Sequence, residues 1–393
     1  MADIFIVAAK RSAIGSFGGS LKDTPPIELA IPVAKAAIEQ SGISAQNIDH
    51  AIYGHVIQTE PRDMYSPRCI SIGAGLSETA PAFLVNRLCG SGLQAIVSGI
   101  QLVKLGDANT VLAGGVEVMS RGPYILPKQR WGTRMGDASA VDMMLGALHD
   151  PFGIGHMGIT AENVAKDFEI SRTEMDEFAA ESQARAKSAQ SAGYFIEQIC
   201  SLEVKDGRKV KTHETDEFVR GDTTLQSLSD LRPAFEKDGL VTAGNSSGIN
   251  DGTASVVLAS KSAVAKNNVS PLARIVSYGF GGVAPRIMGM GPVPASKMAL
   301  ERAGLSVNDL AVVESNEAFA AQACAVSKQL GLDASIVNPN GGAIALGHPV
   351  GATGAIIMTK LIYELLRRKE RYGMATMCIG GGQGISVIVD AEL

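Results

Sequence analysis

Residues 35–48, KAAIEQSGISAQNI, decide the expected fold, because residues 297–310, KMALERAGLSVNDL, match them without a gap. Two shorter matches follow in the same order, namely residues 85–86 (VN) with 337–338 and residues 112–115 (LAGG) with 378–381 (CIGG). Three matches in one order are hard to attribute to chance, so the sequence predicts two similar halves. Such halves, packed together, would bring equivalent loops to one shared centre.

Around this repeat, short apolar segments alternate with helical patterns. Residues 4–9 and 51–56 read as buried strands, and Pro25-Pro26 opens a helix whose apolar spacing ends at Gly42. Strands that alternate with helices favour an α/β fold, with a parallel or mixed sheet that is covered by helices.

The middle of the chain differs in composition and in helix pattern from the two halves that flank it. Residues 119–248 hold the single tryptophan, Trp131, and long amphipathic helices, one of which opens on the capping signature Ser171-Arg-Thr-Glu174. This stretch reads as an insertion laid over the sheet. We therefore expect three parts: an N-terminal half (residues 1–118 with 249–270), the insertion (119–248) and a C-terminal half (271–393).

Composition narrows the function classes. The 393 residues are 46% hydrophobic and 19% charged, with a net charge of −5, which fits a globular protein with large cores and argues against nucleic acid as a partner. The longest basic tract, residues 205–211, contains the hairpin-turn signal Asp206-Gly207. We expect no membrane association, because no apolar stretch approaches the length of a span and the first apolar run is too short for a signal sequence.

The chain has five widely spaced cysteines and no C-x-x-C pair: Cys69, Cys89, Cys200, Cys324 and Cys378. An odd number of separated cysteines favours reduced thiols in a cytoplasmic protein. The same spacing disfavours a zinc site, so we expect no bound metal.

Cys89 differs from the other cysteines in its setting. It lies in Asn86-Arg-Leu-Cys-Gly-Ser-Gly92, between an apolar run and a helical pattern that starts near Gly90. The free N–H groups and the positive end of such a helix lower the pKa of a thiol and favour the nucleophilic thiolate. From this stretch alone, a buried structural cysteine is the alternative.

Three further stretches carry candidate chemistry: Asn316-Glu-Ala-Phe319, Gly347-His-Pro349 and Cys378-Ile-Gly-Gly-Gly382. A cysteine nucleophile needs a base for its proton, and His348, in a turn between glycine and proline, is the best-placed of the six histidines. Taken singly, each residue has a plainer role, with His348 as a loop histidine, Cys378 as core and Asn316 as a turn residue.

Together these stretches resemble the thiolase family, of the acetyl-CoA acetyltransferase and bacterial β-ketothiolase (biosynthetic) type. The motifs are intact and in the family's order, as are His156-Met-Gly-Ile-Thr-Ala-Glu-Asn163 and Val241-Thr-Ala-Gly-Asn-Ser-Ser247 in the insertion. The resemblance covers nearly the whole chain. It implies two βαβ-rich halves in a five-layered α-β-α-β-α core, with an inserted loop domain that contacts coenzyme A.

The resemblance also implies the reaction, a reversible Claisen condensation of an acyl-CoA with acetyl-CoA to a 3-oxoacyl-CoA and coenzyme A. Cys89 would carry the acyl group after His348 accepts its proton, and Cys378 would remove the α-proton of the second acetyl-CoA. His348 with a water held by Asn316, and the N–H groups of Cys89 and Gly380, would stabilise the two negative oxygens. Coenzyme A thioesters are then substrates, and no cofactor is required.

By the same resemblance, ten residues contact the pantetheine arm, the nucleotide or the acyl group: Leu148, His156, Met157, Arg220, Phe235, Ala243, Ser247, Met288, Ala318 and Phe319. Ordinary core packing is the alternative for Leu148, Met157 and Phe235.

Two segments bear on substrate length and assembly. Residues 58–65, QTEPRDMY, resemble bacterial β-ketothiolases that accept acyl chains beyond acetyl. Residues 121–136 match the family's tetramerisation loop, so we expect a homotetramer built as a dimer of dimers.

Two other classes share parts of the pattern. A decarboxylating ketoacyl synthase has a cysteine nucleophile but lacks a second catalytic cysteine at the position of Cys378. A non-catalytic relative that binds lipid or coenzyme A typically loses one of the motifs. Both are disfavoured, because every motif is present here.

Overall fold

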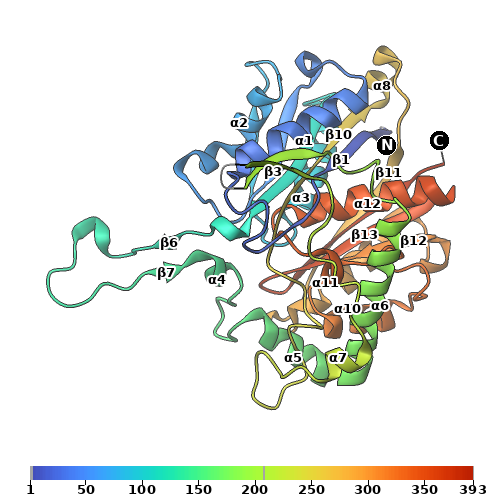
Figure 1. Cartoon of the computed structure of the whole chain (residues 1–393). Helices are drawn as coiled ribbons and strands as arrows, with labels where there is room; N and C mark the ends of the chain where they lie inside the picture. Colours follow the sequence, from blue (N-terminus) through green and yellow to red (C-terminus); the bar gives the residue numbers. More distant parts are fainter. Residues whose placement is uncertain (1–2, 207–208, 393) are drawn as a thin grey trace.

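In the computed structural model, which describes residues 3–206 and 209–392, one hydrogen-bonded path of nine strands runs through both halves of the chain (Figure 1). Its order is β4 (Ala82–Val85), β3 (His50–Gly54), β5 (Thr110–Val118), β10 (Asn250–Ser260), β1 (Ile4–Arg11), β11 (Ala273–Gly282), β14 (Gln383–Asp390), β13 (Tyr372–Ile379) and β12 (Val312–Ser315). A short tenth strand, β2 (Gly15–Ser16), pairs with β10.

Both halves have the same strand pattern. In the N-terminal half, β3 is parallel to β4 and β5, while β10 is antiparallel to β5 and β1. In the C-terminal half, β12 is parallel to β13, while β14 is antiparallel to β13 and β11. Within the described part of the sheet, β1 and β11 join the halves, where Phe5 pairs with Arg274 and Ile6 with Ala273. The predicted mixed sheet is confirmed.

Helices cover each half of the sheet and fill the space between the halves. The middle layer consists of α3 (Ser91–Leu105) and α12 (Thr353–Arg368). The outer layers contain α1 (Pro26–Ser41), α2 (Ser66–Gly73) and α8 (Lys261–Asn267) on one side, and α9 (Pro292–Ala303) and α10 (Ala320–Leu330) on the other.

Side-chain alternation along the strands produces these layers, because successive residues of a strand face opposite sides of the sheet. On β13, Ala375 and Met377 belong to the core around α12, whereas Met374 belongs to the core under α9. On β1, Ile6 faces the middle layer and Val7 faces α1. The result is the expected five-layered stack of helices and sheets.

The main repeat is confirmed in detail. Helix α1 ends at Gly42, at φ 68°, and is followed by a 3-10 turn, Ala45–Asn47. Helix α9 ends in the same way at Gly304, at φ 67°, and is followed by the turn Val307–Asp309. The left-handed conformation ends a helix most easily at glycine, which explains why both positions hold one.

Both shorter matches are wrong. Ala51 of β3 pairs with Ala82, and its equivalent Val313 of β12 pairs with Val337, so residues 337–338 correspond to 82–83 and not to 85–86. Equivalent backbone hydrogen bonds at the starts of β5 and β13, accepted by Thr110 at 3.0 Å and by Tyr372 at 2.9 Å, fix the register of the two halves. In that register, residues 112–115 correspond to 374–377 and not to 378–381. The glycines of the first stretch lie inside β5, whereas those of 378–381 follow the end of β13.

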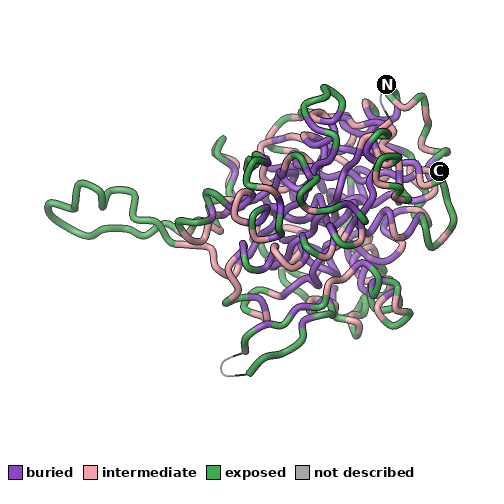
Figure 2. The backbone as a smooth tube through the Cα atoms, turned by 90° about the horizontal axis from the view of Figure 1, so that it is seen from above, coloured by how far each residue is buried: buried purple, intermediate pink, exposed green. Residues whose placement is uncertain are grey.

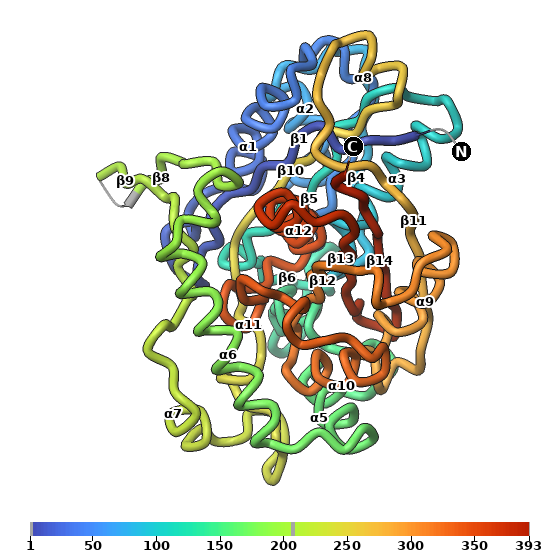
Figure 3. Tube along the Cα trace, turned by 90° about the vertical axis from the view of Figure 1, so that its right-hand side faces the viewer, coloured from blue at the N-terminus to red at the C-terminus, as the bar shows by residue number. Residues whose placement is uncertain are grey.

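The segment between β5 and β10 lies outside the large sheet. Its described residues form two hairpins, β6 (Tyr124–Ile125) with β7 (Val141–Asp142) and β8 (Leu202–Asp206) with β9 (Lys209–His213), and helices α4 (Met143–Ala147), α5 (Met157–Asp167), α6 (Arg172–Ser191) and α7 (Leu225–Ser229). Figure 3 shows α5 and α6 beside α10 and α11 (Ala343–Leu346) of the C-terminal half.

Two local predictions fall in this segment. The capping signature is confirmed, because the Ser171 hydroxyl accepts the Glu174 N–H at 3.2 Å at the start of α6. The predicted turn at Asp206-Gly207 is flanked by the paired strands β8 and β9, but Gly207 itself lies outside the described residues.

Helix α3 corrects one expectation. Residues 88–105 are long and apolar enough to match a membrane span by length and composition. However, α3 lies in the middle layer, where Leu93, Ile96 and Val97 pack fully buried among the other core residues. Its apolarity is that of a core helix.

Candidate active site

One cavity of about 340 Å³ lies where loops of both halves meet the insertion. Three of the five predicted catalytic residues, Cys89, His348 and Gly380, line it together with all ten predicted substrate contacts. Nine further residues that the sequence did not single out complete the wall: Leu88, Met119, Ala147, Phe218, Ala234, Ser246, Gly248, Ile249 and Val350.

Cys89 occupies a tight turn directly before α3. Leu88 adopts a left-handed conformation at φ 46°, and the Ser91 hydroxyl braces the turn by donating to Leu88 O at 2.6 Å. Helix α3 begins at Ser91 with Gly90 as its cap, as predicted. A non-glycine residue with this φ is uncommon, and such strained backbone conformations cluster at functional sites.

The predicted direction of the Cys89 pKa is wrong. Burial raises the pKa of the thiol, although the N–H groups of Gly380 and of Cys89 itself favour the thiolate. The loss of water outweighs those backbone groups and the helix end. Cys89 therefore rests as a thiol and needs a base before it can attack a thioester.

His348 lines the same cavity as Cys89 and is almost fully buried. Its Nδ1 lies 2.7 Å from the Thr353 hydroxyl, and its Nε2 has no hydrogen-bond partner among the described residues. Burial lowers the pKa of His348 to about 4. The imidazole is thus neutral near pH 7 and able to accept a proton.

This pKa predicts an acid-sensitive stability. In the unfolded chain His348 takes up a proton below about pH 6.5, while in the folded protein it stays neutral down to about pH 4. Acid therefore favours the unfolded state. Between pH 7 and pH 5, urea denaturation should show a loss of free energy of unfolding that is about 2 kcal/mol larger for the wild type than for His348→Gln. Equal losses would contradict a neutral buried His348.

Cys378 and Asn316 are buried and do not line the cavity. Cys378, at the end of β13, is fully buried, and its pKa is raised first by burial and then by the charge of a Cys89 thiolate. The Asn316 N–H donates to Thr376 O at 3.0 Å, so Asn316 sits beside β13. Both polar atoms of its side-chain amide are buried and lack a partner among the described residues. A buried amide in that state is suited to hold a small polar group.

Aromatic rings form one side of the cavity. His156 caps α5, and its ring stacks on Phe235 with centroids 4.8 Å apart. Phe235 in turn meets Phe319 edge to face at 6.0 Å. Gly158 leaves room for this stack, because a Cβ there would lie 2.2 Å from the Phe235 ring.

Backbone pairing joins the insertion to the C-terminal half along the same cavity. The Ser247 N–H donates to Ala318 O at 3.0 Å, and Ser246 pairs with Phe319. The two sequence motifs that contain these residues therefore lie side by side and form a continuous wall.

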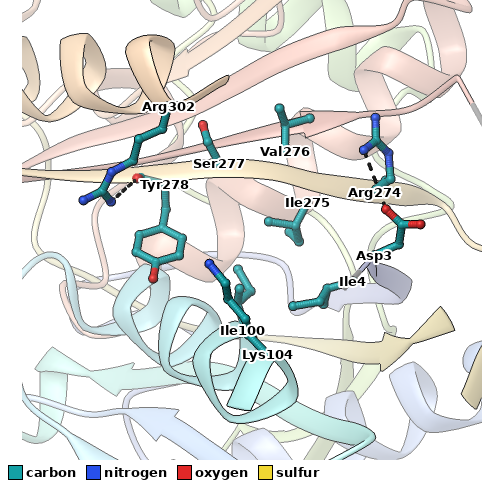
Figure 4. Close-up of a pocket in the computed structure, with 10 residues that line it drawn as sticks. All are labelled: Asp3, Ile4, Ile100, Lys104, Arg274, Ile275, Val276, Ser277, Tyr278 and Arg302. Carbon is teal, nitrogen blue, oxygen red and sulfur yellow. Dashed lines mark hydrogen bonds and ion pairs between the residues drawn. The ribbon is translucent and has the colours of Figure 1, made fainter. Parts of the chain in front are cut away.

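A larger hollow, of about 580 Å³, lies between β11 and the end of α3 (Figure 4). None of the fifteen predicted site residues lines it. Both arginines that line this hollow already have protein partners. Arg302 donates to Tyr278 O at 2.8 Å, and Arg274 forms an ion pair with Asp390 at 2.8 Å. The predicted chemistry thus belongs to the smaller cavity.

Comparison with known proteins identifies this arrangement. Models of the thiolase N-terminal and C-terminal domains match residues 4–262 and 269–391. The chain belongs to the thiolase family. It is 56% identical to beta-ketothiolase BktB of Cupriavidus necator over 99% of both chains, and 49% identical to an acetyl-CoA acetyltransferase of the same organism over the full length of both.

Solved structures of thiolases also match the fold of this chain. A crystal structure of human mitochondrial 3-ketoacyl-CoA thiolase in complex with CoA matches this thiolase with a TM-score of 0.97 and 46% identity, over 99% of this chain and 98% of that chain. The resemblance stated from the motifs is confirmed, and with it the fold. A decarboxylating ketoacyl synthase is correspondingly disfavoured.

The sequence reasoning missed the residues that hold the His348 turn of the thiolase. Asn250 accepts the His348 N–H at 3.0 Å, and the buried carboxyl of Glu117 accepts the Gly351 N–H at 2.9 Å. Burial raises the pKa of Glu117 to about 8. Thr353 could have been noticed from its place five residues after His348, but Asn250 and Glu117 are distant in the sequence and carry no such signal.

Proposed function

We propose that this thiolase is an acetyl-CoA C-acyltransferase that condenses an acyl-CoA with acetyl-CoA to a 3-oxoacyl-CoA and coenzyme A, reversibly and through an acyl-Cys89 intermediate. The observation that carries the proposal is the shared cavity. It holds a thiol, Cys89, and a neutral imidazole, His348, with a second thiol, Cys378, buried next to them.

In the first step, Cys89 gives its proton to Nε2 of His348, and its sulfur bonds to the carbonyl carbon of the acyl-CoA. The N–H groups of Cys89 and Gly380 stabilise the oxyanion. The bond to coenzyme A then breaks, and the departing thiolate takes the proton of Cys378. The acyl group stays on Cys89, and Cys378 is left as a thiolate.

In the second step, acetyl-CoA enters and the Cys378 thiolate removes a proton from its α-carbon. Burial suits Cys378 to this role, because a thiol with a raised pKa is a strong base once it has lost its proton. The carbanion attacks the acyl carbon, the bond to Cys89 breaks, and His348 returns the proton to Cys89. His348 and a water held by Asn316 stabilise the enolate oxygen. These steps use side chains of the protein and two thioesters, without a cofactor.

Coenzyme A is proposed to lie along the aromatic wall and out past Arg220. A second hollow of about 270 Å³ shares Phe218, Arg220 and Ala243 with the main cavity and continues to polar residues such as Ser227. The guanidinium of Arg220 lies 5.2 Å from the Phe218 ring. A largely apolar cavity followed by a polar outlet that carries the Arg220 guanidinium fits a pantetheine arm that leads to a phosphorylated nucleotide.

A coupled assay of acetoacetyl-CoA thiolysis, repeated with 3-oxohexanoyl-CoA, tests this function. We expect coenzyme A-dependent cleavage of acetoacetyl-CoA, and cleavage of the longer substrate if the chain accepts acyl groups beyond acetyl. Absence of cleavage of both substrates would overturn the proposed function.

We also propose a cytoplasmic homotetramer. The β6–β7 arm projects from the body with an exposed surface (Figure 2), and Trp131 on it is 92% exposed. Exposed apolar side chains gathered on one arm favour contact with another subunit. All five cysteines are unpaired, which fits a reducing compartment.

Light scattering should therefore give a tetramer for the wild type and a smaller species for a Tyr124→Ser/Trp131→Ser double variant, because the double variant removes apolar area from the arm. Ile196→Ser, at an exposed site outside the arm, is the matched control and should remain a tetramer. A monomeric wild type would contradict the proposed assembly.

A further inference from the structure

The side chain of His348 has a single hydrogen-bond partner among the described residues. Its Nδ1 lies 2.7 Å from Oγ1 of Thr353, the first residue of α12, which is 2% exposed. Nε2, the other ring nitrogen, has no partner among the described residues and belongs to a side chain that lines the cavity with Cys89. Whether the Thr353 hydroxyl acts as donor or acceptor towards Nδ1 therefore decides whether Nε2 of the neutral imidazole carries a hydrogen.

The Thr353 hydroxyl has only one hydrogen to give. Its Oγ1 also lies 2.8 Å from Pro349 O, the carbonyl one helical turn back. A carbonyl oxygen can only accept, so the hydroxyl hydrogen goes to Pro349, as in the common bond from a helical threonine to the preceding turn. The lone pairs of Oγ1 then face Nδ1, which must carry the hydrogen of that contact.

We propose that Thr353 is a positioning residue that fixes His348 as the Nδ1–H tautomer and so leaves Nε2 as the proton acceptor for Cys89. This inference rests on the proposed function for its consequence, but the tautomer itself is a property of the resting protein.

The tautomer matters because His348 is neutral near pH 7, its pKa being lowered to about 4 by burial. A neutral imidazole has one bare nitrogen, and only a bare Nε2 can accept the Cys89 proton. After the transfer, Nε2–H becomes a donor for the enolate oxygen of the second step, while Nδ1–H still bonds to Thr353. The contact between Thr353 and Nδ1 thus allows Nε2 to act first as a proton acceptor and then as a hydrogen-bond donor.

The test compares three variants of the full-length protein in acetoacetyl-CoA thiolysis. Thr353→Val keeps the shape but removes the hydroxyl, and Thr353→Ser keeps the hydroxyl. Thr359→Val is the matched control, because Thr359 is also buried on α12 and bonds one turn back, to Ala355 O at 2.9 Å, without contacting His348. Circular dichroism and thermal melting establish that each variant is folded.

We expect Thr353→Val to lower kcat by at least about tenfold with KM for acetoacetyl-CoA within about twofold, the pattern for a misplaced base and an intact binding site. Thr353→Ser should restore most of kcat, and Thr359→Val should match the wild type. A wild-type kcat in Thr353→Val, or an equal loss in Thr353→Ser, would overturn the proposal.

Solid-state ¹⁵N NMR of the histidine-labelled wild type gives a readout that needs no turnover and no folded variant at Thr353. With His348→Asn to assign the signal, a protonated Nδ1 and a bare Nε2 are expected. A protonated Nε2 in the resting wild type would overturn the proposal even if the enzyme is active. If the wild type instead fails to cleave acetoacetyl-CoA, the proposed function fails while the NMR result still decides the tautomer.

Discussion

Cys89→Ala should abolish labelling of the protein by radiolabelled acetyl-CoA and lower kcat of thiolysis by at least about 10⁴-fold. The reason is that the Cys89 thiol lines the cavity and interacts with the Gly380 N–H, where the acyl oxygen would be stabilised. Labelling is measured after gel filtration of the denatured protein, so that only covalently attached acetyl remains.

Cys69→Ala is the control for this loss. Cys69 is also a half-buried free cysteine and lies on α2, away from the cavity. Its variant should keep both labelling and turnover. Stoichiometric labelling of Cys89→Ala would show that another residue carries the acyl group and that the proposed division of roles is wrong.

Cys378→Ala should separate the two halves of the reaction. We expect it to keep acetyl labelling of Cys89, because coenzyme A can also leave as the thiolate and take its proton from water. Condensation of acetyl-CoA should fall by about 10³-fold, because Cys378 supplies the base for the α-carbon and general acid–base groups contribute on this scale. Labelling and acetoacetyl-CoA formation are measured on the same preparation, so that a loss of one without the other is visible.

Cys324→Ala is the matched control, since Cys324 is buried in the same core cluster as Cys378 but faces the charges of Glu174, Lys328 and Glu317, whereas Cys378 faces Cys89. It should leave condensation close to the wild-type rate. A Cys378→Ala protein that condenses as fast as Cys324→Ala would exclude Cys378 as the base. Loss of labelling together with condensation would show that the proton which Cys378 gives to the departing coenzyme A is indispensable for acylation.

Much of the fold could be predicted because its signals are local and repeated. The gap-free match of residues 35–48 with 297–310 reflects two helices that end at left-handed glycines and lead into equivalent strands. Apolar alternation and helix-ending residues are short-range features, so they can be read without knowing the fold.

The shorter match of residues 112–115 with 378–381 failed for a physical reason. Two consecutive glycines can allow another segment to pack closely against a strand, or they can form a turn after the strand. The amino-acid sequence alone does not distinguish these two uses. Only the hydrogen-bond register of β5 and β13 shows that the stretches are four positions apart.

By itself, the sequence of this thiolase determined the family, the two-half architecture and many of the residues that meet at one cavity, because each motif is a contiguous stretch that contains its own turn or helix start. The tertiary structure decided the ionisation states of the site residues and which residues hold the His348 turn in place. Cys89 begins a helix, which favours the thiolate, but burial among residues from both halves raises its pKa. Glu117 and Asn250 hold the His348 turn from distant strands. Desolvation and long-range hydrogen bonds depend on which segments pack together, and neighbours along the chain do not reveal that.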